Sequence, residues 1–140
     1  MTMPLSVRFP PGVLDRLRRR AQSIPGSTPS GLAIRLMEEG LRQAEHPEIV
    51  FKDRPTGRCA ALAFGPDVWE VTKALHEFDE RGPAAVGGTA ELLGLTESAV
   101  RVAIAYYADY ADEIDAEVDA AKAASEAAER AWLSEQRLLA

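Results

Sequence analysis

The segment MPLSVRFPP, residues 3–11, alternates between large apolar side chains and other residues. Successive side chains of an extended chain point to opposite faces, so the alternation predicts a short β-strand with one apolar side. Proline donates no backbone hydrogen bond and suits the first turn of a helix, so the proline pair at its end predicts that the strand stops there. The apolar positions are Leu5, Val7 and Phe9, and the opposite positions are Pro4, Ser6 and Arg8.

No second strand follows closely enough to form a hairpin with this segment. A lone strand would leave its backbone N–H and C=O groups unpaired along both edges. The simplest partner is the same segment of a second copy of the chain, which predicts a homodimer joined by an antiparallel ribbon. The apolar side of the ribbon would face inward. Pro4, Ser6 and Arg8 of both copies would face outward. The alternative is an ordinary edge strand whose alternation arises by chance.

Two helices are predicted after the strand. The first covers residues 11–23 and has an apolar stripe of Val13, Leu14, Leu17 and Ala21. Its arginines either contact phosphates or form a solvated face, and the sequence leaves both interpretations open. These arginines are Arg16, Arg18, Arg19 and Arg20.

The second helix is expected over residues 30–44, after a break at residues 24–27. Thr28 has the chemistry of an N-cap, and Pro29 suits the first helical position. A helix N-terminus beside hydroxyl groups can bind phosphate, although a plain helix cap has the same sequence. Gly40 lowers helix propensity and indicates a close helix approach across the dimer.

The order strand, helix, turn, helix over residues 3–46 resembles the MetJ/Arc ribbon-helix-helix of bacterial repressors and antitoxins. The resemblance implies that the ribbon enters the major groove of DNA with Pro4, Ser6 and Arg8 at the base-facing positions. Arg8 would bind two acceptors of a guanine, whereas Pro4 departs from the usual polar residue. In the family, the turn before the second helix contacts the DNA backbone. The matching residues are Ser27, Thr28 and Ser30.

Residues 47–111 form a second predicted domain. A hairpin is expected over residues 49–62, because Pro55 and Gly57 lie between two apolar runs. A helix should follow Asp67, and residues 84–110 have the spacing of a helix-turn-helix. Residues 48–115 resemble a small helix-turn-helix domain of unassigned function found in bacterial antitoxins. That resemblance carries no catalytic residues.

Residues 112–140 are predicted to form one long helix, because alanine is frequent and is the best helix former. Large apolar side chains gather only near its far end, so the helix would be poorly stabilised alone. This pattern indicates a segment that docks in a groove of another protein, Trp132 and Leu133 first. The alternatives are packing on its own domain and a coiled coil with a second copy.

The charge is unevenly distributed along the 140 residues, whose net charge is −6. Residues 1–46 carry seven arginines against four carboxylates, whereas residues 111–140 carry three bases against eight acids. The basic residues 1–46 suit a nucleic-acid partner, and the acidic residues 111–140 suit a different partner. The single Cys59 fits a reducing cytoplasm.

Several function classes find no support in the sequence. No apolar run approaches the roughly 20 residues of a membrane helix, and the amino terminus lacks a secretory signal. No catalytic set, metal cluster or phosphate loop stands out, so we expect no enzyme activity, no cofactor and no metal.

Together, residues 1–46 and residues 112–140 resemble the antitoxin of a bacterial toxin–antitoxin pair. They are most like VapB-type antitoxins, whose partners are PIN-domain ribonucleases. The resemblance implies a mainly α protein that binds operator DNA as a dimer and neutralises a ribonuclease toxin with its C-terminal helix. The alternative is a stand-alone ribbon-helix-helix repressor whose C-terminal helix mediates oligomerisation. The residues implied in toxin binding are Arg130 and Arg137, which would disturb the carboxylate-lined metal site of the toxin, and the apolar anchors Trp132, Leu133 and Leu138.

Overall fold

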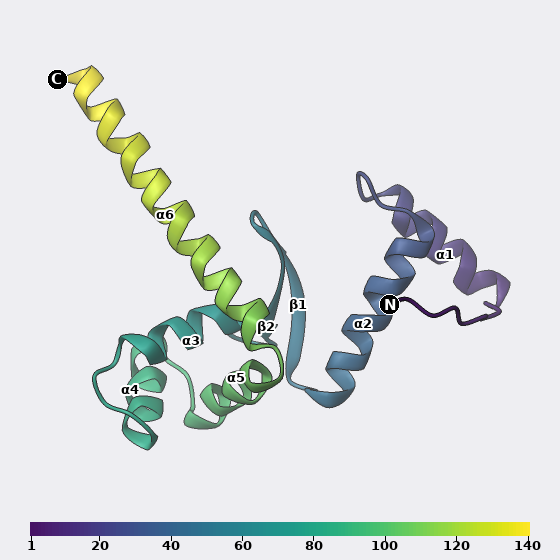
Figure 1. Ribbon diagram of the computed structural model, residues 1–140, viewed down its shortest axis with the longest axis horizontal. Helices are drawn as coiled ribbons and strands as arrows, with labels where there is room; N and C mark the ends of the chain where they lie inside the picture. The colour runs from purple at the N-terminus through teal and green to yellow at the C-terminus, as the bar shows by residue number, and fades with distance from the viewer. The chain divides into compact units, whose positions relative to one another are not determined.

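The computed structural model describes residues 1–140 as two compact units, Met1–Glu45 and His46–Ala140. Six helices and one two-stranded antiparallel hairpin make up the chain, which confirms the predicted mainly helical class (Figure 1). None of the helices has both the length and the apolar character needed to cross a membrane.

The first unit contains helices α1 (Pro11–Gln22) and α2 (Pro29–Glu45). Each begins with proline, which lacks the N–H that a first helical residue leaves unpaired. The Thr28 hydroxyl accepts a hydrogen bond from the Gly31 N–H at 3.1 Å, so Thr28 is the expected cap. Between the helices, Gly26 has a φ of +75°, which a residue with a side chain rarely adopts.

The strand expected over residues 4–9 is not formed within one chain. Residues 1–10 have neither helix nor strand, and residues 1–9 make no backbone hydrogen bond to the rest of the molecule. A strand exists only when a neighbour pairs with its backbone groups, and the single chain offers this segment no such neighbour.

The first unit has almost no hydrophobic core. Among its apolar residues only Ala21 and Leu32 are buried, and the helices leave Ile34, Met37 and Leu41 exposed. Burial of apolar surface is the main favourable term in folding, so one copy of this unit has little to hold it together.

The second unit begins with the hairpin of β1 (Ile49–Arg54) and β2 (Gly57–Leu62). Ile49 pairs with Leu62 at its open end and Arg54 with Gly57 beside the turn, as the proline–glycine signal predicts. The Arg54 guanidinium donates to both carboxylate oxygens of Asp67, at 2.6 Å and 3.1 Å, and thereby ties the hairpin to the start of the next helix.

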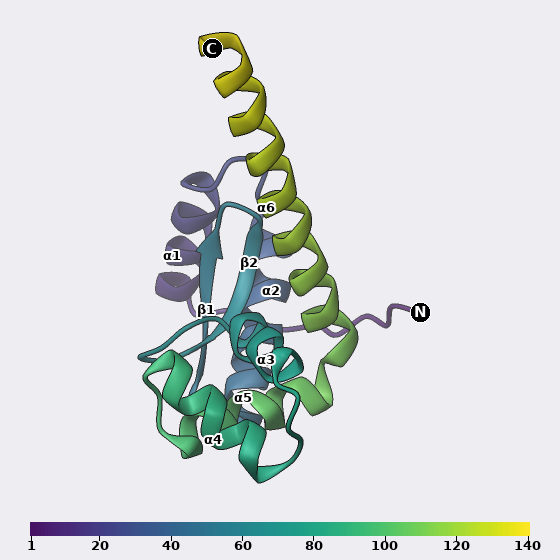
Figure 2. The same ribbon diagram turned by 90° about the vertical axis from the view of Figure 1, so that its left-hand side faces the viewer.

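Helices α3 (Val68–Glu77) and α5 (Glu97–Asp109) pack on strand β2 of the hairpin, and α4 (Pro83–Leu93) packs on both of these helices (Figure 2). Gly94 ends α4 in the left-handed conformation, with a φ of +66°, and the Thr96 hydroxyl caps α5 by accepting the Ala99 N–H. Their apolar sides enclose one core that includes the fully buried Val71 and Tyr106.

The last helix, α6 (Ala111–Leu139), starts in this core and then leaves it. Ile114 is fully buried, while Val118 and Ala121 are half-buried. From Lys122 onward every residue is exposed, and the helix projects beyond the other elements of its unit (Figures 1 and 2). The first turns of α6 therefore pack on the second unit, which was one of the alternatives for this helix.

Candidate nucleic-acid interface and partner-binding helix

The alternation of the N-terminal segment is preserved in the structure. Leu5, Val7 and Phe9 all line one apolar hollow of about 690 Å³, whereas Pro4, Ser6 and Arg8 do not line it. The rest of the hollow comes from the apolar sides of α1 and α2. Even so, Leu5 remains 79% exposed and Val7 51% exposed. One copy of the chain thus presents an apolar face that it cannot cover by itself.

The opposite positions of the segment are free to meet a ligand. Ser6 and Arg8 are exposed, and their side chains make no hydrogen bond or ion pair with the rest of the chain. A guanidinium carries donors in a fixed fork that matches two acceptors of one guanine edge. The Arg8 guanidinium is therefore available for such a contact. Pro4 has no backbone N–H to donate.

The turn before α2 brings the other predicted DNA-binding residues to one helix end. Thr28 uses its hydroxyl oxygen as the cap acceptor, and its hydroxyl proton remains available for donation. Ser30 is exposed in the first turn, where its backbone N–H makes no hydrogen bond, and Ser27 is half-buried in the preceding turn. A phosphate at this end would meet a free N–H, hydroxyl donors and the positive end of the helix dipole.

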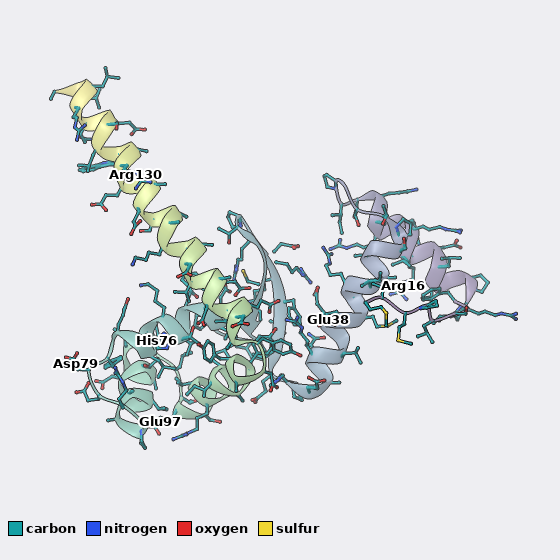
Figure 3. All side chains as sticks on the ribbon, viewed as in Figure 1. Arg16, Glu38, His76, Asp79, Glu97 and Arg130 are labelled. Carbon is teal, nitrogen blue, oxygen red and sulfur yellow. The ribbon has the colours of Figure 1, made fainter.

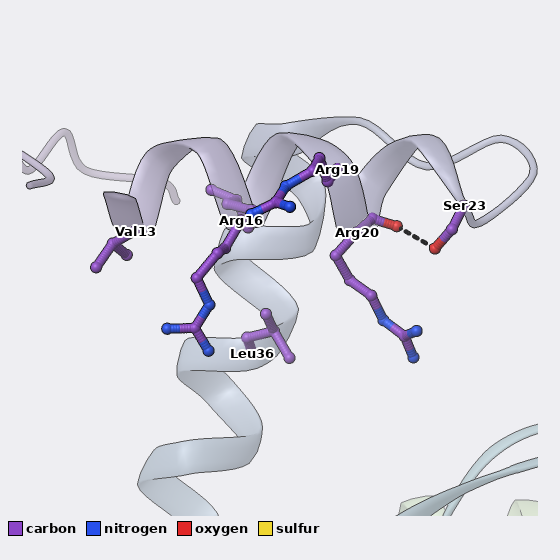
Figure 4. Close-up of a pocket in the computed structure, with 7 residues that line it drawn as sticks. Val13, Arg16, Arg19, Arg20, Ser23 and Leu36 are labelled. Carbon is purple, nitrogen blue, oxygen red and sulfur yellow. Dashed lines mark hydrogen bonds between the residues drawn. The ribbon is translucent and has the colours of Figure 1, made fainter. Parts of the chain in front are cut away.

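A second hollow, of about 610 Å³, lies between α1 and α2 (Figure 4). Its walls carry a row of arginines whose guanidinium groups form no ion pair. Periodicity predicted an arginine-rich side of the first helix, but it did not indicate that Leu36 of α2 would complete a hollow beneath it. The lining residues are Val13, Arg16, Leu17, Arg19, Arg20, Ser23 and Leu36.

The far end of α6 carries all the residues predicted to bind a toxin, and all are exposed. Trp132 is 56% exposed. It lies on the same side of α6 as Ile114, about five turns further along at 3.6 residues per turn. Arg130 is exposed on α6 (Figure 3), and Arg137 follows seven residues later on the same side of the helix. Leu133 and Leu138 complete an exposed apolar end with no cover in this chain.

Two groups in the second unit are engaged in contacts within it. The His46 Nε2 lies 2.8 Å from the Asp109 carboxylate, and the ring meets Tyr106 edge-on. Burial, together with the negative charge of Glu117, raises the pKa of the Cys59 thiol to about 11. At neutral pH this thiol stays protonated, which makes it a poor nucleophile.

The sequence did not predict one hydrogen-bonded contact at the start of α3. Asp67 was expected to cap the helix, and it forms a capping box with Glu70. It also accepts hydrogen bonds from Arg54 and from the Trp69 indole N–H at 3.1 Å. Only the fold brings Arg54 to this carboxylate, so no spacing in the sequence signalled the contact.

No family model, curated protein or solved structure matches the chain.

Proposed function

We propose that the chain is the antitoxin of a toxin–antitoxin pair. Two copies bind operator DNA through a ribbon built from residues 4–9, and the end of α6 neutralises a ribonuclease toxin. One observation supports the proposed DNA-binding dimer. The apolar face of Leu5, Val7 and Phe9 is uncovered, and it lies beside the exposed apolar sides of α1 and α2.

A second copy offers that face the partner that fits it best. Antiparallel pairing of two such segments satisfies their backbone groups and buries the apolar side chains in one step. The same pairing turns both copies of Pro4, Ser6 and Arg8 outward on one surface. A basic first unit then favours an anionic, phosphate-bearing ligand over a basic one.

The proposed toxin binding is supported by the exposed end of α6. Nineteen residues from Lys122 to Ala140 cover nothing in their own unit, yet they carry Trp132 and three leucines. Tryptophan and arginine are the residue types that most often dominate protein interfaces. This composition supports docking of the helix in a groove of a partner protein.

The experiment compares full-length chain with a chain that ends at Ala121, each co-expressed with the product of the adjacent reading frame as the candidate toxin. Ile114 is buried, so a cut at Asp112 would damage the core, whereas a cut after Ala121 spares it. We expect full-length chain to retain a ribonuclease and suppress its activity, and the shortened chain to lose both effects. Operator binding should survive the cut.

The second candidate is a stand-alone repressor whose α6 mediates oligomerisation. It is favoured by the three- and four-residue spacing that links Val118, Ala121, Ser125, Ala128 and Trp132, since that spacing also suits a coiled coil. In that case full-length chain would form tetramers without any toxin, and the shortened chain would form dimers.

A further inference from the structure

Phe64 is the most exposed large apolar residue of the second unit, with an exposed fraction of 104%. It occupies a tight turn between β2 and α3. The turn is closed by two hydrogen bonds, from the Gly65 N–H to the Leu62 carbonyl at 3.2 Å and from the Leu62 N–H to the Pro66 carbonyl at 3.0 Å. Turns favour small and polar residues, so neither the turn nor the core explains a phenylalanine at this position.

The Phe64 ring stands beside an apolar hollow of about 390 Å³. One wall of the hollow is formed by the turn and by the residues before β1, and the other wall includes Ala99 and Val102 of α5. Single exposed apolar residues are normal on a protein surface, but an exposed ring beside an uncovered hollow forms one contiguous apolar surface. We call the ring and the two walls together the Phe64 patch.

A projecting ring and a hollow in one patch make that patch self-complementary. When two copies meet around a two-fold axis, a residue on one side of the axis faces the partner's residue from the other side. An axis between the two walls would place the Phe64 ring of each copy in the hollow of the other, against Ala99 and Val102. Pockets of about 300–1,000 Å³ hold ligands larger than one phenyl ring, so the ring fits the hollow.

The charges of the two walls are complementary under the same rotation. Glu48 lines the wall that carries Phe64, where its carbonyl accepts the Ala63 N–H at 3.1 Å. Arg101 precedes Val102 on α5, at the opposite wall. The side chains of Glu48 and Arg101 are exposed, and neither forms a hydrogen bond or an ion pair within the chain. The rotation that seats the ring therefore brings Glu48 of each copy toward Arg101 of the other.

A nucleic acid fits this patch less well than a second copy does. A duplex requires a basic surface, whereas Arg101 is outnumbered here by Glu48 and Glu97. A phosphate backbone would also leave the Phe64 ring in water. A second copy covers the ring and pairs the charges at the same time.

The contact is too small to hold two copies together by itself. A phenylalanine buries about 150–250 Å². Two rings and the surfaces that cover them therefore stay below the roughly 1,200 Å² of a stable interface. A ribbon between two N-terminal segments would hold the second units at a high effective concentration, at which a weak contact forms. The second units would separate again once the first units melt.

We propose that the Phe64 patch is a self-association surface of the second unit. Phe64 of each copy fills the hollow of the other, and Glu48 of each copy pairs with Arg101 of the other. The inference rests on the homodimer of the proposed function, and it adds a contact that involves neither the ribbon nor the helices of the first unit. The ribbon and the patch strengthen each other, because closing either contact brings the other within reach.

Removal of the ring tests the contact in the full-length chain. We expect Phe64→Ala to raise the concentration of half-association in sedimentation equilibrium about tenfold, through loss of the linked second contact. The matched control is Leu92→Ala, which removes an apolar side chain that is 64% exposed in the same unit but does not line the hollow. The Leu92→Ala chain should associate like the wild type.

Charge exchange tests the pairing of the walls. Glu48→Arg and Arg101→Glu should each weaken self-association, because like charges then face each other across the axis. The double variant Glu48→Arg/Arg101→Glu should associate like the wild type again. Both residues are exposed, so circular dichroism should find every variant folded. Failure of the double variant to regain association would contradict the pairing.

Three results separate this contact from the rest of the account. A Phe64→Ala curve that superposes on the wild-type curve at every concentration would overturn the proposal and leave the ribbon dimer standing. Unchanged self-association with lost retention of the candidate toxin would also overturn it, and would assign the patch to the toxin. A wild-type chain that stays monomeric at every concentration would refute the homodimer of the proposed function and this contact with it.

Discussion

The two units of this chain contrast in how they are held together. The second unit encloses a core of side chains such as Val71, Tyr106 and Ile114 that are fully buried in one copy. The first unit buries only Ala21 and Leu32 among its apolar residues, and its helices leave large apolar side chains such as Ile34 and Met37 exposed. A segment of this size rarely buries enough surface alone. The second unit therefore encloses its core within one chain, whereas the first leaves apolar surface uncovered, and a second copy is the cover that we propose for it.

The largest expected effect comes from a charge on the apolar side of the N-terminal segment. Val7→Asp should abolish self-association and melt α1 and α2, because an unpaired carboxylate in the paired ribbon would lose its hydration. Sedimentation equilibrium and circular dichroism measure both losses. The second unit should remain folded.

The neighbouring residue provides the matched control. Ser6→Asp places the same charge on the outward side, so the dimer should form while DNA binding falls through repulsion of phosphates. Equal loss of self-association in both variants would contradict the inward and outward sides of the ribbon.

The next effect concerns the second unit alone. Ile114→Ala should lower its free energy of unfolding by about 2–5 kcal/mol, because the removed side chain is fully buried and leaves a cavity. Calorimetry at several protein concentrations should find that its midpoint is independent of concentration. A concentration-dependent midpoint would mean that this unit also depends on a second copy.

The contrast also explains what the sequence could predict. Helical periodicity placed the helices of the first unit well: residues 11–23 were expected against Pro11–Gln22, and residues 30–44 against Pro29–Glu45. Proline and glycine located the hairpin turn. These features depend on neighbours in the chain, which a sequence displays directly.

The features that escaped prediction depend on distant contacts. Ile114 and Trp132 follow the same periodicity along α6, yet the first is buried and the second is exposed. Periodicity identifies the apolar side of a helix, but it does not identify what covers that side. For the same reason, the hollow completed by Leu36 could not be predicted from the arginines of α1. The DNA and toxin contacts stay predictions.

An intermediate effect is expected at the proposed DNA surface. Arg8→Ala should weaken specific operator binding by about 1–3 kcal/mol, the usual worth of a bidentate contact to a base. Electrophoretic mobility shifts at constant salt measure the change, and self-association should stay intact because Arg8 lies outside the apolar hollow. Unchanged discrimination between operator and random DNA would exclude base contact by Arg8.

The smallest expected effect on stability comes from the end of α6. Trp132→Ala should change the unfolding free energy by no more than about 0.5 kcal/mol, because the exposed ring covers nothing in its unit. The same change should weaken binding of the proposed toxin at least tenfold, and Glu129→Ala should bind as the wild type does. A dimer lost on Trp132→Ala would instead favour the oligomerisation role of α6.

Amide hydrogen exchange of residues 5–9, followed across protein concentration, measures whether two N-terminal segments pair as a ribbon. In one copy these amides have no hydrogen-bond partner. We predict that amides in this segment become protected as the dimer forms, in the alternating pattern of an antiparallel ribbon. Exchange that stays fast at every concentration, with the chain already dimeric, would rule out the paired ribbon.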